Sequence, residues 1–301
     1  MKSMKLSRGL ILFAAASLCF ASCQNSGRDT RGIEKSADFD TLQVTQRSHL
    51  EENPANPFCD IRVEFIYPVH SMGVGPDTLQ QFFIQNMFGM PYDHLPPREA
   101  VEAYVKNYIE NYTYDAGTYR DAVSDMMEIN ALIPGIDLAD SEHSVNESFY
   151  SYHETLSNSI VYNRRGIVSF QVEQSNNKGG ATSYVAYRNY VVDVNTGRQV
   201  TESEVFRAGY DQALQNLIIT SLLEQNGVKS VDELEDLGFF GIREIVPNKN
   251  FLLTDEGFIY TYNKGEYSAY QLDAPEVFIP YTAIRSLLRE HTPAAKLADL
   301  K

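Results

Sequence analysis

The side chains that could do chemistry in this chain are scattered along it. No two of its six histidines stand at a metal-ligand spacing such as His-x-x-x-His. The best local pairs are Asp93 with His94 and His153 with Glu154, and neither has a recognisable nucleophile beside it. The sequence also has no Gly-x-Ser-x-Gly turn, which presents the nucleophile in many hydrolases. We therefore expect no metal, no cofactor and no catalytic centre.

A cysteine near the N-terminus is the residue with the clearest chemistry. Three positive residues precede an apolar run over residues 10–20 that is too short to span a bilayer as a stable helix. The small residues Ala21 and Ser22 then lead into Cys23, a pattern typical of a bacterial lipoprotein signal peptide over residues 1–22. We expect Cys23 to be acylated, because buried lipid contributes about 0.8 kcal/mol per CH₂ and would tether the protein to a membrane.

The overall charge narrows the classes of partner. The chain carries a formal net charge of −15 at pH 7, which argues against nucleic acid and against electrostatic binding to anionic lipid. The charge favours a basic partner, although an exported domain can also be acidic merely to stay in solution. The 19 tyrosines and 16 phenylalanines indicate half-buried β-sheet or a face that binds protein.

Composition divides the mature chain into three parts. Residues 23–57 are polar, contain Asn-Pro pairs and lack sustained periodicity, so they predict a flexible linker. Residues 58–157 predict an N-terminal domain, with a strand around the buried thiol of Cys59 and a helix over residues 98–112. Residues 158–301 predict a C-terminal domain.

The C-terminal part shows the more regular pattern. A hairpin turn is expected at residues 163–166, and a closing helix at residues 282–290. Gly257 lies in a turn between two short strands, where we expect it to take a positive φ. Further predicted elements are strands at 159–174, 183–194, 251–254, 258–262 and 276–281, and helices at 210–222 and 231–237. Because helices and strands are mixed without a strict βαβ rhythm, we predict an α+β fold with a mainly antiparallel sheet and two sub-domains.

Several short motifs occur in an order that resembles a known family. They are Gly179-Gly180-Ala181, Asp193-Val194-Asn195-Thr196-Gly197, Glu204-Val205-Phe206, and residues 250–257, 267–270 and 277–281. This order is similar to the extracytoplasmic domain shared by the lysozyme-sensing anti-sigma factor RsiV and the peptidoglycan deacetylase PdaC, and residues 58–157 resemble the smaller domain that commonly precedes it. Thr182 stands where the family usually has a histidine, and Ala274-Pro275 where it commonly has Gly-Pro. We expect no deacetylase domain after the closing helix.

Together these features predict an envelope lipoprotein that is a non-catalytic binding module. The resemblance implies lysozyme-like proteins or peptidoglycan as the ligand, and the lipid on Cys23 implies the outer membrane, on its periplasmic or surface face. The candidate binding residues are Tyr184, Tyr187, Tyr190, Tyr260 and Tyr262. One alternative is a cell-wall glycan hydrolase or deacetylase-like enzyme, whose site would hold two convergent carboxyl groups about 5 to 9 Å apart. Another is an assembly or scaffold lipoprotein whose partner is a second envelope protein.

Overall fold

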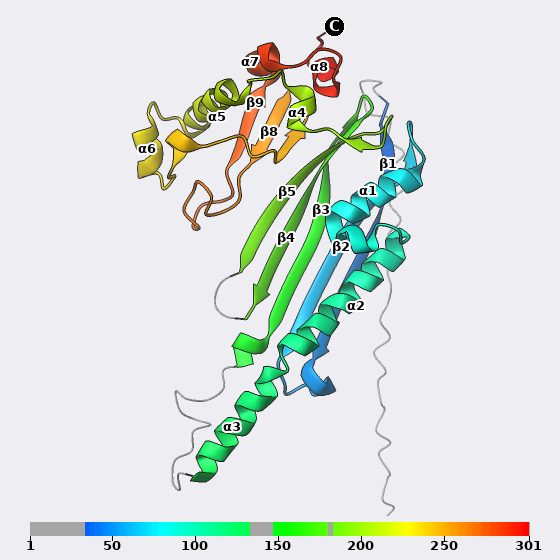
Figure 1. The fold of residues 1–301 in the computed structure, drawn as a ribbon, viewed down its shortest axis with the longest axis vertical. Coiled ribbons are helices and arrows are strands. Elements are labelled where there is room, and N and C mark those ends of the chain that lie inside the picture. The colour runs from blue at the N-terminus through cyan, green and yellow to red at the C-terminus, as the bar shows by residue number, and fades with distance from the viewer. Residues whose placement is uncertain (1–33, 133–146, 180–182, 301) are drawn as a thin grey trace, which may run out of the picture. The chain divides into compact units, whose positions relative to one another are not determined.

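The computed structural model describes residues 34–132, 147–179 and 183–300 (Figure 1). The N-terminal signal segment, Cys23, His143 and Thr182 lie outside the described residues. Residues Glu34–Lys301 form one compact unit. Its described part contains two β-sheets and the helices that pack on them, which confirms the α+β prediction.

The larger sheet has six strands in the order β1-β2-β3-β4-β5-β6. They are β1 (Ala37–His49), β2 (Phe58–Ser71), β3 (Tyr152–Arg164), β4 (Ile167–Lys178), β5 (Tyr184–Asp193) and β6 (Arg198–Gln199). Neighbouring strands are antiparallel except β2 and β3, which run parallel. Because parallel neighbours need a long crossover, the chain travels a long way between these two strands, and the described part of this connection contains three α-helices. The sheet is therefore mixed, although most of its pairs are antiparallel as expected.

Two helices cover one face of this sheet. They are α1 (Pro76–Phe88) and α2 (Pro97–Asp115), which both pack against β2 and are followed by α3 (Thr118–Leu132) (Figure 1). Proline opens α1 and α2, at a position where a missing N–H costs no helical hydrogen bond. The buried residues Val101, Val105 and Tyr112 follow helical spacing along α2, which confirms the helix predicted over residues 98–112.

The first core lies between these helices and the sheet. Phe170 of β4 stacks on Phe83 of α1 with ring centroids 4.0 Å apart, and both side chains are buried. Other members of the first core are Ile61, Val63, Phe65, Leu79, Ile84, Leu156, Val168, Val172 and Val192.

β1 occupies much of the stretch that the sequence assigned to a linker, residues 23–57. It forms a hairpin with β2, which the Leu50 N–H closes by donating to the Pro57 carbonyl at 2.9 Å. Phe39, Leu42 and Val44 are only partly buried against the first core. β1 is an edge strand with one neighbour, so polar residues dominate it and its alternation is weak. The linker prediction is therefore wrong for residues 37–57.

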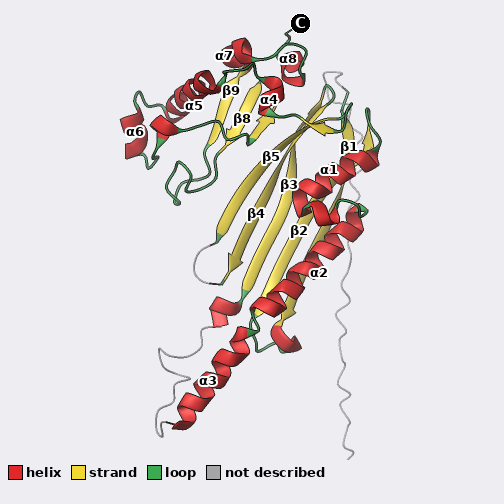
Figure 2. Cartoon of the chain, in the orientation of Figure 1, coloured by secondary structure: helices red, strands yellow, loops and turns green. Residues whose placement is uncertain are grey.

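The smaller sheet is antiparallel, with the order β7-β8-β9. Its strands are β7 (Phe251–Leu253), β8 (Gly257–Thr261) and β9 (Glu276–Pro280), and the helices around it are α4 (Glu202–Val205), α5 (Asp211–Asn226), α6 (Val231–Asp236), α7 (Tyr281–Ile284) and α8 (Pro293–Leu297) (Figure 2). Helix α5 packs on β9 and places Leu214, Ile218 and Leu222 in a second core. The helix predicted over residues 282–290 is instead split into α7, a 3₁₀ turn at Arg285–Leu287, and α8 further on.

Gly257 is required for a different reason from the one that the sequence indicated. It is not among the glycines with a positive φ. A Cβ atom at this position would lie 2.1 Å from the carbonyl oxygen of Ile279, which on β9 precedes Pro280, the residue paired with Gly257. The close approach of β9, rather than a left-handed turn, therefore explains the glycine.

Two asparagines join the larger sheet to the smaller one. The Asn250 Oδ1 accepts a hydrogen bond from the Asn189 backbone N–H at 2.6 Å, and its Nδ2 donates to the carbonyls of Tyr187 at 3.1 Å and Thr261 at 2.8 Å. The Asn189 Nδ2 donates to the Asn250 carbonyl at 3.2 Å and to the Thr261 Oγ1 at 2.8 Å. We call these contacts the asparagine joint.

The expected boundary after residue 157 does not separate the hydrophobic cores, because the first core takes residues from both sides of it. The position after residue 157 falls inside β3, which pairs with β2 on one side and β4 on the other. The second core also takes Tyr162 and Ile167 from the larger sheet. The two cores therefore meet through shared strands rather than through a linker.

Candidate functional site

The tyrosines proposed from the sequence do not share one surface. Tyr184 is 49% exposed, and Tyr187 and Tyr190 are half-buried on the same strand. Tyr260 and Tyr262 are fully buried in the second core. Tyr260 lies on β8, the central strand of its sheet, and the Tyr262 hydroxyl donates to the Val246 carbonyl at 2.8 Å. The binding prediction is therefore wrong for Tyr260 and Tyr262, which are core residues.

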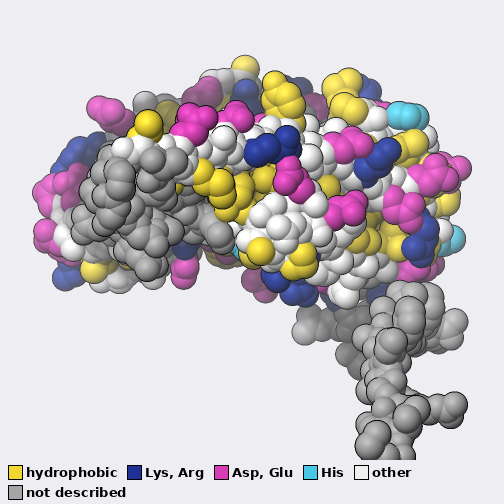
Figure 3. Space-filling view, turned by 90° about the horizontal axis from the view of Figure 1, so that it is seen from below, with side chains coloured by type: hydrophobic (Ala, Val, Ile, Leu, Met, Phe, Trp, Pro, Cys, Tyr) yellow, Lys and Arg dark blue, Asp and Glu magenta, His cyan; other side chains and the backbone are white. Residues whose placement is uncertain are grey.

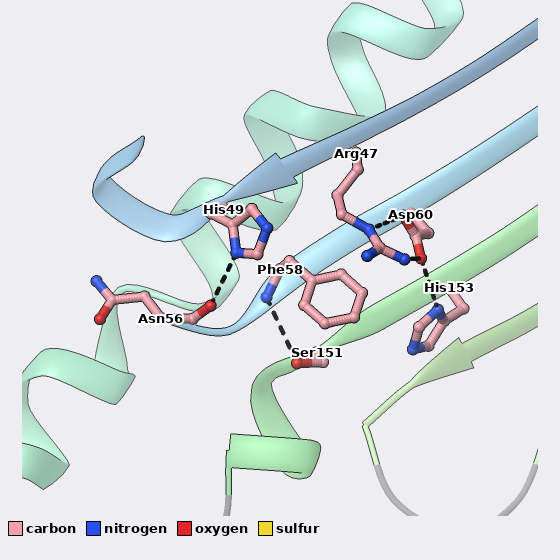
Figure 4. Close-up of polar contacts among 7 residues, drawn as sticks. All are labelled: Arg47, His49, Asn56, Phe58, Asp60, Ser151 and His153. Atoms are coloured by element: carbon pink, nitrogen blue, oxygen red, sulfur yellow. Dashed lines mark hydrogen bonds and ion pairs between the residues drawn. The ribbon is translucent and has the colours of Figure 1, made fainter. Parts of the chain in front are cut away.

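The sequence pair His153 and Glu154 is divided by the sheet, because successive strand residues point to opposite faces. On the face away from α2, the His153 Nδ1 lies 3.5 Å from the Asp60 Oδ2 (Figure 4). Arg47 binds the same carboxylate through Nε at 2.6 Å and Nη2 at 2.5 Å, and its guanidinium carbon lies 4.3 Å from the ring centre of Phe58. The Arg47 guanidinium lowers the pKa of Asp60. These contacts tie β1, β2 and β3 together.

Other potentially reactive side chains contact backbone or carboxylate groups or are buried in the fold. The His49 Nδ1 is 3.1 Å from the Asn56 carbonyl oxygen (Figure 4), and the His70 Nδ1 is 3.7 Å from an Asp38 carboxylate oxygen. Cys59 is buried as the sequence predicted, and burial raises the pKa of its thiol to about 11, so it is a poor nucleophile. Among the residues that the structure describes, no three His, Cys, Asp or Glu side chains gather in a group that could hold a metal ion.

Two hollows that share Tyr104 lie beside α2, and we call them together the α2 groove. The first hollow, about 190 Å³, is lined by Tyr104, Asn107, Tyr108, Asn111, Tyr112, Asp115, Tyr152, Glu154 and Lys178. The second, about 320 Å³, is lined by Gln85, Asn86, Met87, Phe88, Gly89, Tyr104, Gln174, Arg188 and Tyr190. The groove therefore draws its walls from α1, α2, β3, β4 and β5.

The rim of the first hollow is a polar stripe on α2. Asn107, Asn111 and Asp115 recur at every fourth residue, so they line one side of the helix, and all three are exposed. The Asn111 Nδ2 donates to the Asn107 Oδ1 at 3.0 Å. Tyr152 on β3 and Lys178 at the end of β4 complete the lining from the sheet. Amide, carboxylate and ammonium groups thus surround a hollow that contains four tyrosines.

A buried carboxyl group lies in the wall of the first hollow. Glu154 is only 6% exposed and accepts a hydrogen bond from the Tyr104 hydroxyl. Burial, with the Glu154 carboxylate as a second cause, raises the pKa of Tyr104, so this hydroxyl keeps its proton and remains a donor. The hydroxyls of Tyr108 and Tyr112 are also shielded from solvent, but they have no hydrogen-bond partner in the part of the chain that the structure describes.

These tyrosines allow a matched pair of substitutions. We expect Tyr104→Phe to lower the free energy of unfolding by about 1 to 3 kcal/mol, because it leaves the buried Glu154 carboxylate without its donor. We expect Tyr108→Phe to leave the stability unchanged or raised, because it removes a hydroxyl that makes no hydrogen bond. Urea unfolding of both variants measures the difference, and equal losses would contradict the assignment.

A second buried carboxyl group, Glu202, lies at the start of α4, beside the smaller sheet. It is 2% exposed and accepts hydrogen bonds from the Tyr210 hydroxyl at 3.0 Å and the Lys249 backbone N–H at 2.8 Å. Burial raises its pKa, while these hydrogen bonds act in the opposite direction. Glu202 does not line the α2 groove. We therefore assign it a structural role in the packing of α4 near the smaller sheet.

The raised pKa of Glu202 predicts a pH-dependent stability. Because the folded state holds this proton more tightly than the unfolded state, the contribution is fully present below the unfolded pKa of about 4.3 and is lost as the pH rises through the folded pKa. We therefore expect the melting temperature of Glu202→Gln, relative to the wild type, to increase from pH 4 to pH 7. Thermal unfolding across this range, with the exposed Glu224→Gln as control, tests it. If the melting temperature of Glu202→Gln relative to the wild type stayed constant or decreased with pH, the pKa of Glu202 would not be raised in the folded state.

One wall of the groove has a signal in the sequence. The tyrosines of α2 recur at helical spacing, and Tyr112 is buried. The neighbouring stripe of Asn107, Asn111 and Asp115 also has helical spacing, which indicates a polar line along one side of the helix. Its partners Tyr152 and Lys178 are distant in the sequence, so only the fold brings them to this helix.

Comparisons with known proteins show a family model that matches part of the chain and solved structures with a similar fold. Residues 203–282 match the family model described as "Protein of unknown function (DUF3298)". The fold is similar to that of a DUF3298 family member from Bacteroides fragilis NCTC 9343, with a TM-score of 0.74 and 23% identity over 88% of this chain and 98% of that chain. It is also similar to a DUF3298 family protein from Pseudomonas aeruginosa PAO1, with a TM-score of 0.55 and 12% identity over 85% of this chain and 96% of that chain. No curated protein matches the sequence significantly.

Proposed function

We propose that this chain, which carries a DUF3298 domain, is an envelope lipoprotein that binds peptidoglycan through the α2 groove without catalysing a reaction. The anchor would be the lipid on Cys23, in a bacterial outer membrane. No helix among the described residues is long and apolar enough to cross a membrane.

The observation that carries this proposal is the lining of the α2 groove. Tyrosine rings offer apolar faces on which sugar rings can lie, and amides and carboxylates around them can exchange hydrogen bonds with sugar hydroxyls. Each hollow is near or below the lower end of the range of about 300 to 1,000 Å³ that is usual for small-molecule pockets. Two small adjacent hollows could each hold one sugar unit of a polysaccharide. They are less suited to enclosing a single small-molecule substrate.

Sedimentation with purified cell-wall sacculi tests the proposal. The full chain in detergent should pellet with sacculi, and soluble glycan fragments should compete for the binding. The same samples should release no soluble muropeptides, because the proposed role is binding alone. A chain that stays in the supernatant at tens of micromolar would rule out peptidoglycan as the ligand.

A basic protein of the lysozyme class is the second candidate ligand, and the charge of the chain favours it. A net charge of −15 would steer a basic protein toward this one and speed their association. Asp and Glu side chains are spread over the face in Figure 3, with Lys and Arg between them, rather than gathered in one patch. Binding to lysozyme that disappears in moderate salt would indicate steering without a built interface.

A glycan hydrolase is the catalytic alternative, since Glu154 and Asp115 line the same hollow. Hydrolysis of a glycoside uses two such carboxyl groups, one of them as an acid. We favour binding because Glu154 is buried and already holds the Tyr104 hydroxyl, whereas a general acid must reach the leaving oxygen. Release of muropeptides that Glu154→Gln abolishes would reverse this preference.

A further inference from the structure

The second hollow of the α2 groove contains a cation without a counter-ion. Arg188 lies on β5, half-buried, and makes no ion pair with any carboxylate in residues 34–132, 147–179 and 183–300. Its Nη1 donates to the Gln174 Oε1 over a long 3.4 Å, and its Nε is shielded from solvent without a hydrogen-bond partner. The guanidinium group is therefore poorly satisfied by the protein itself.

The residues that line the second hollow offer Arg188 no negative charge. The chain has 40 acidic residues and 25 basic ones, yet no acidic residue lines the second hollow. The other side chains that line this hollow include the neutral amides of Gln85, Asn86 and Gln174 and the rings of Tyr104 and Tyr190. A half-buried charge that lacks a partner costs stability, and a chain rich in carboxylates could have supplied one. An anionic ligand would supply that partner on binding.

The end of α1 limits what this anion can be. Met87, Phe88 and Gly89 bring the C-terminus of α1 to the same hollow, where the helix dipole carries a partial negative charge. This end would repel a free anion, but its carbonyl groups accept hydrogen bonds from hydroxyl or amide donors. The occupant that suits both walls has a carboxylate facing Arg188 and hydroxyl or N–H donors facing α1. A sugar unit that bears a carboxyl group has this combination.

We propose that the second hollow is a subsite for a carboxylate-bearing sugar, with Arg188 as the residue that recognises the carboxylate. The inference rests on the proposed function and sharpens it, because it requires the bound glycan to be acidic. The first hollow would hold a neighbouring neutral unit against Tyr152 and the stripe of Asn107 and Asn111. Sugars with a lactyl ether and uronic acids both carry the required carboxylate.

Calorimetry with two matched disaccharides tests the inference on the full chain in detergent. One is N-acetylglucosamine linked to N-acetylmuramic acid, and the other is di-N-acetylchitobiose, which lacks the lactyl carboxylate. We expect the acidic disaccharide to bind at least about tenfold more tightly, since a charge-assisted hydrogen bond distinguishes them. A glucuronic acid disaccharide in a third arm shows whether the subsite reads the lactyl group or any sugar carboxylate.

A substitution at Arg188 identifies the residue responsible. Arg188→Gln should reduce the affinity for the acidic disaccharide to that for chitobiose and leave the latter unchanged, while Arg188→Lys should keep part of the preference. Melting temperatures of both variants check that they fold. If both disaccharides bind equally to the wild type, or if Arg188→Gln keeps the preference, the acidic subsite is wrong and the proposed function stands. If no saccharide binds, the proposed function fails as well.

Discussion

Replacing Asn250 by alanine should lower the free energy of unfolding by about 3 kcal/mol or more. The substitution leaves the Asn189 backbone N–H and the Tyr187 carbonyl without the partner that Asn250 provides, while the Thr261 carbonyl keeps the hydrogen bond from the Asn248 Nδ2 at 2.8 Å. A buried polar group that loses its partner costs about 1 to 3 kcal/mol, and two groups lose one here. For a chain of this size the melting temperature should fall by about 6 to 12 °C. Calorimetry and urea unfolding measure both values.

A matched variant separates the asparagine joint from an ordinary asparagine contact. Asn226 lies exposed at the end of α5, where its Nδ2 donates to the Leu222 carbonyl at 2.8 Å. Asn226→Ala removes one hydrogen bond at the surface and should change the free energy of unfolding by less than about 1 kcal/mol. If Asn250→Ala were as mild as this control, the joint would not be what holds the smaller sheet against the larger one.

Removal of the two asparagines of the polar stripe on α2 should weaken glycan binding by at least about tenfold. Asn107→Ala combined with Asn111→Ala deletes two exposed amides from the rim of the first hollow, and two hydrogen bonds of about 0.5 to 1.5 kcal/mol each correspond to this loss. Alanine favours the helix, so α2 should remain folded. Sedimentation with sacculi at increasing protein concentration measures the affinity, and circular dichroism measures the helix.

The control for this variant lies on the same helix. Lys106 and Glu110 form an exposed i,i+4 ion pair, with the Lys106 Nζ 3.7 Å from a Glu110 carboxylate oxygen, and neither residue lines the groove. The double variant Lys106→Ala with Glu110→Ala should bind sacculi as the wild type does. Equal weakening of both double variants would mean that α2 acts through general charge or stability rather than through the groove.

Elements with a strong local pattern could be predicted from the sequence. The buried residues of α2 recur at helical spacing, and the turn at Arg165 and Gly166, both with positive φ, joins β3 and β4 as expected. The edge strand β1 was missed because it has one neighbour and little apolar alternation. The parallel pairing of β2 with β3 depends on a crossover of three helices, and no local signal encodes such pairing.

The candidate site was harder to predict than the fold. Exposed and buried tyrosines look the same in a sequence, so Tyr260 and Tyr262 were mistaken for a surface although they fill the second core. Arg188 occupies an ordinary position in a strand, and only the placement of α1 and α2 over the sheet shows that no carboxylate of the described residues pairs with it. Tertiary contacts determine both the burial of the two tyrosines and the surroundings of Arg188.

Hydrogen exchange of the full chain with and without peptidoglycan fragments tests the central claim most directly. The account predicts slower exchange, on adding fragments, in the part of α2 that carries Asn107, Asn111 and Asp115 and in the strand segments around Tyr152 and Arg188. Exchange in the smaller sheet around Tyr260 should not change. Protection confined to the smaller sheet, or binding without any protection along α2, would contradict the α2 groove as the binding site.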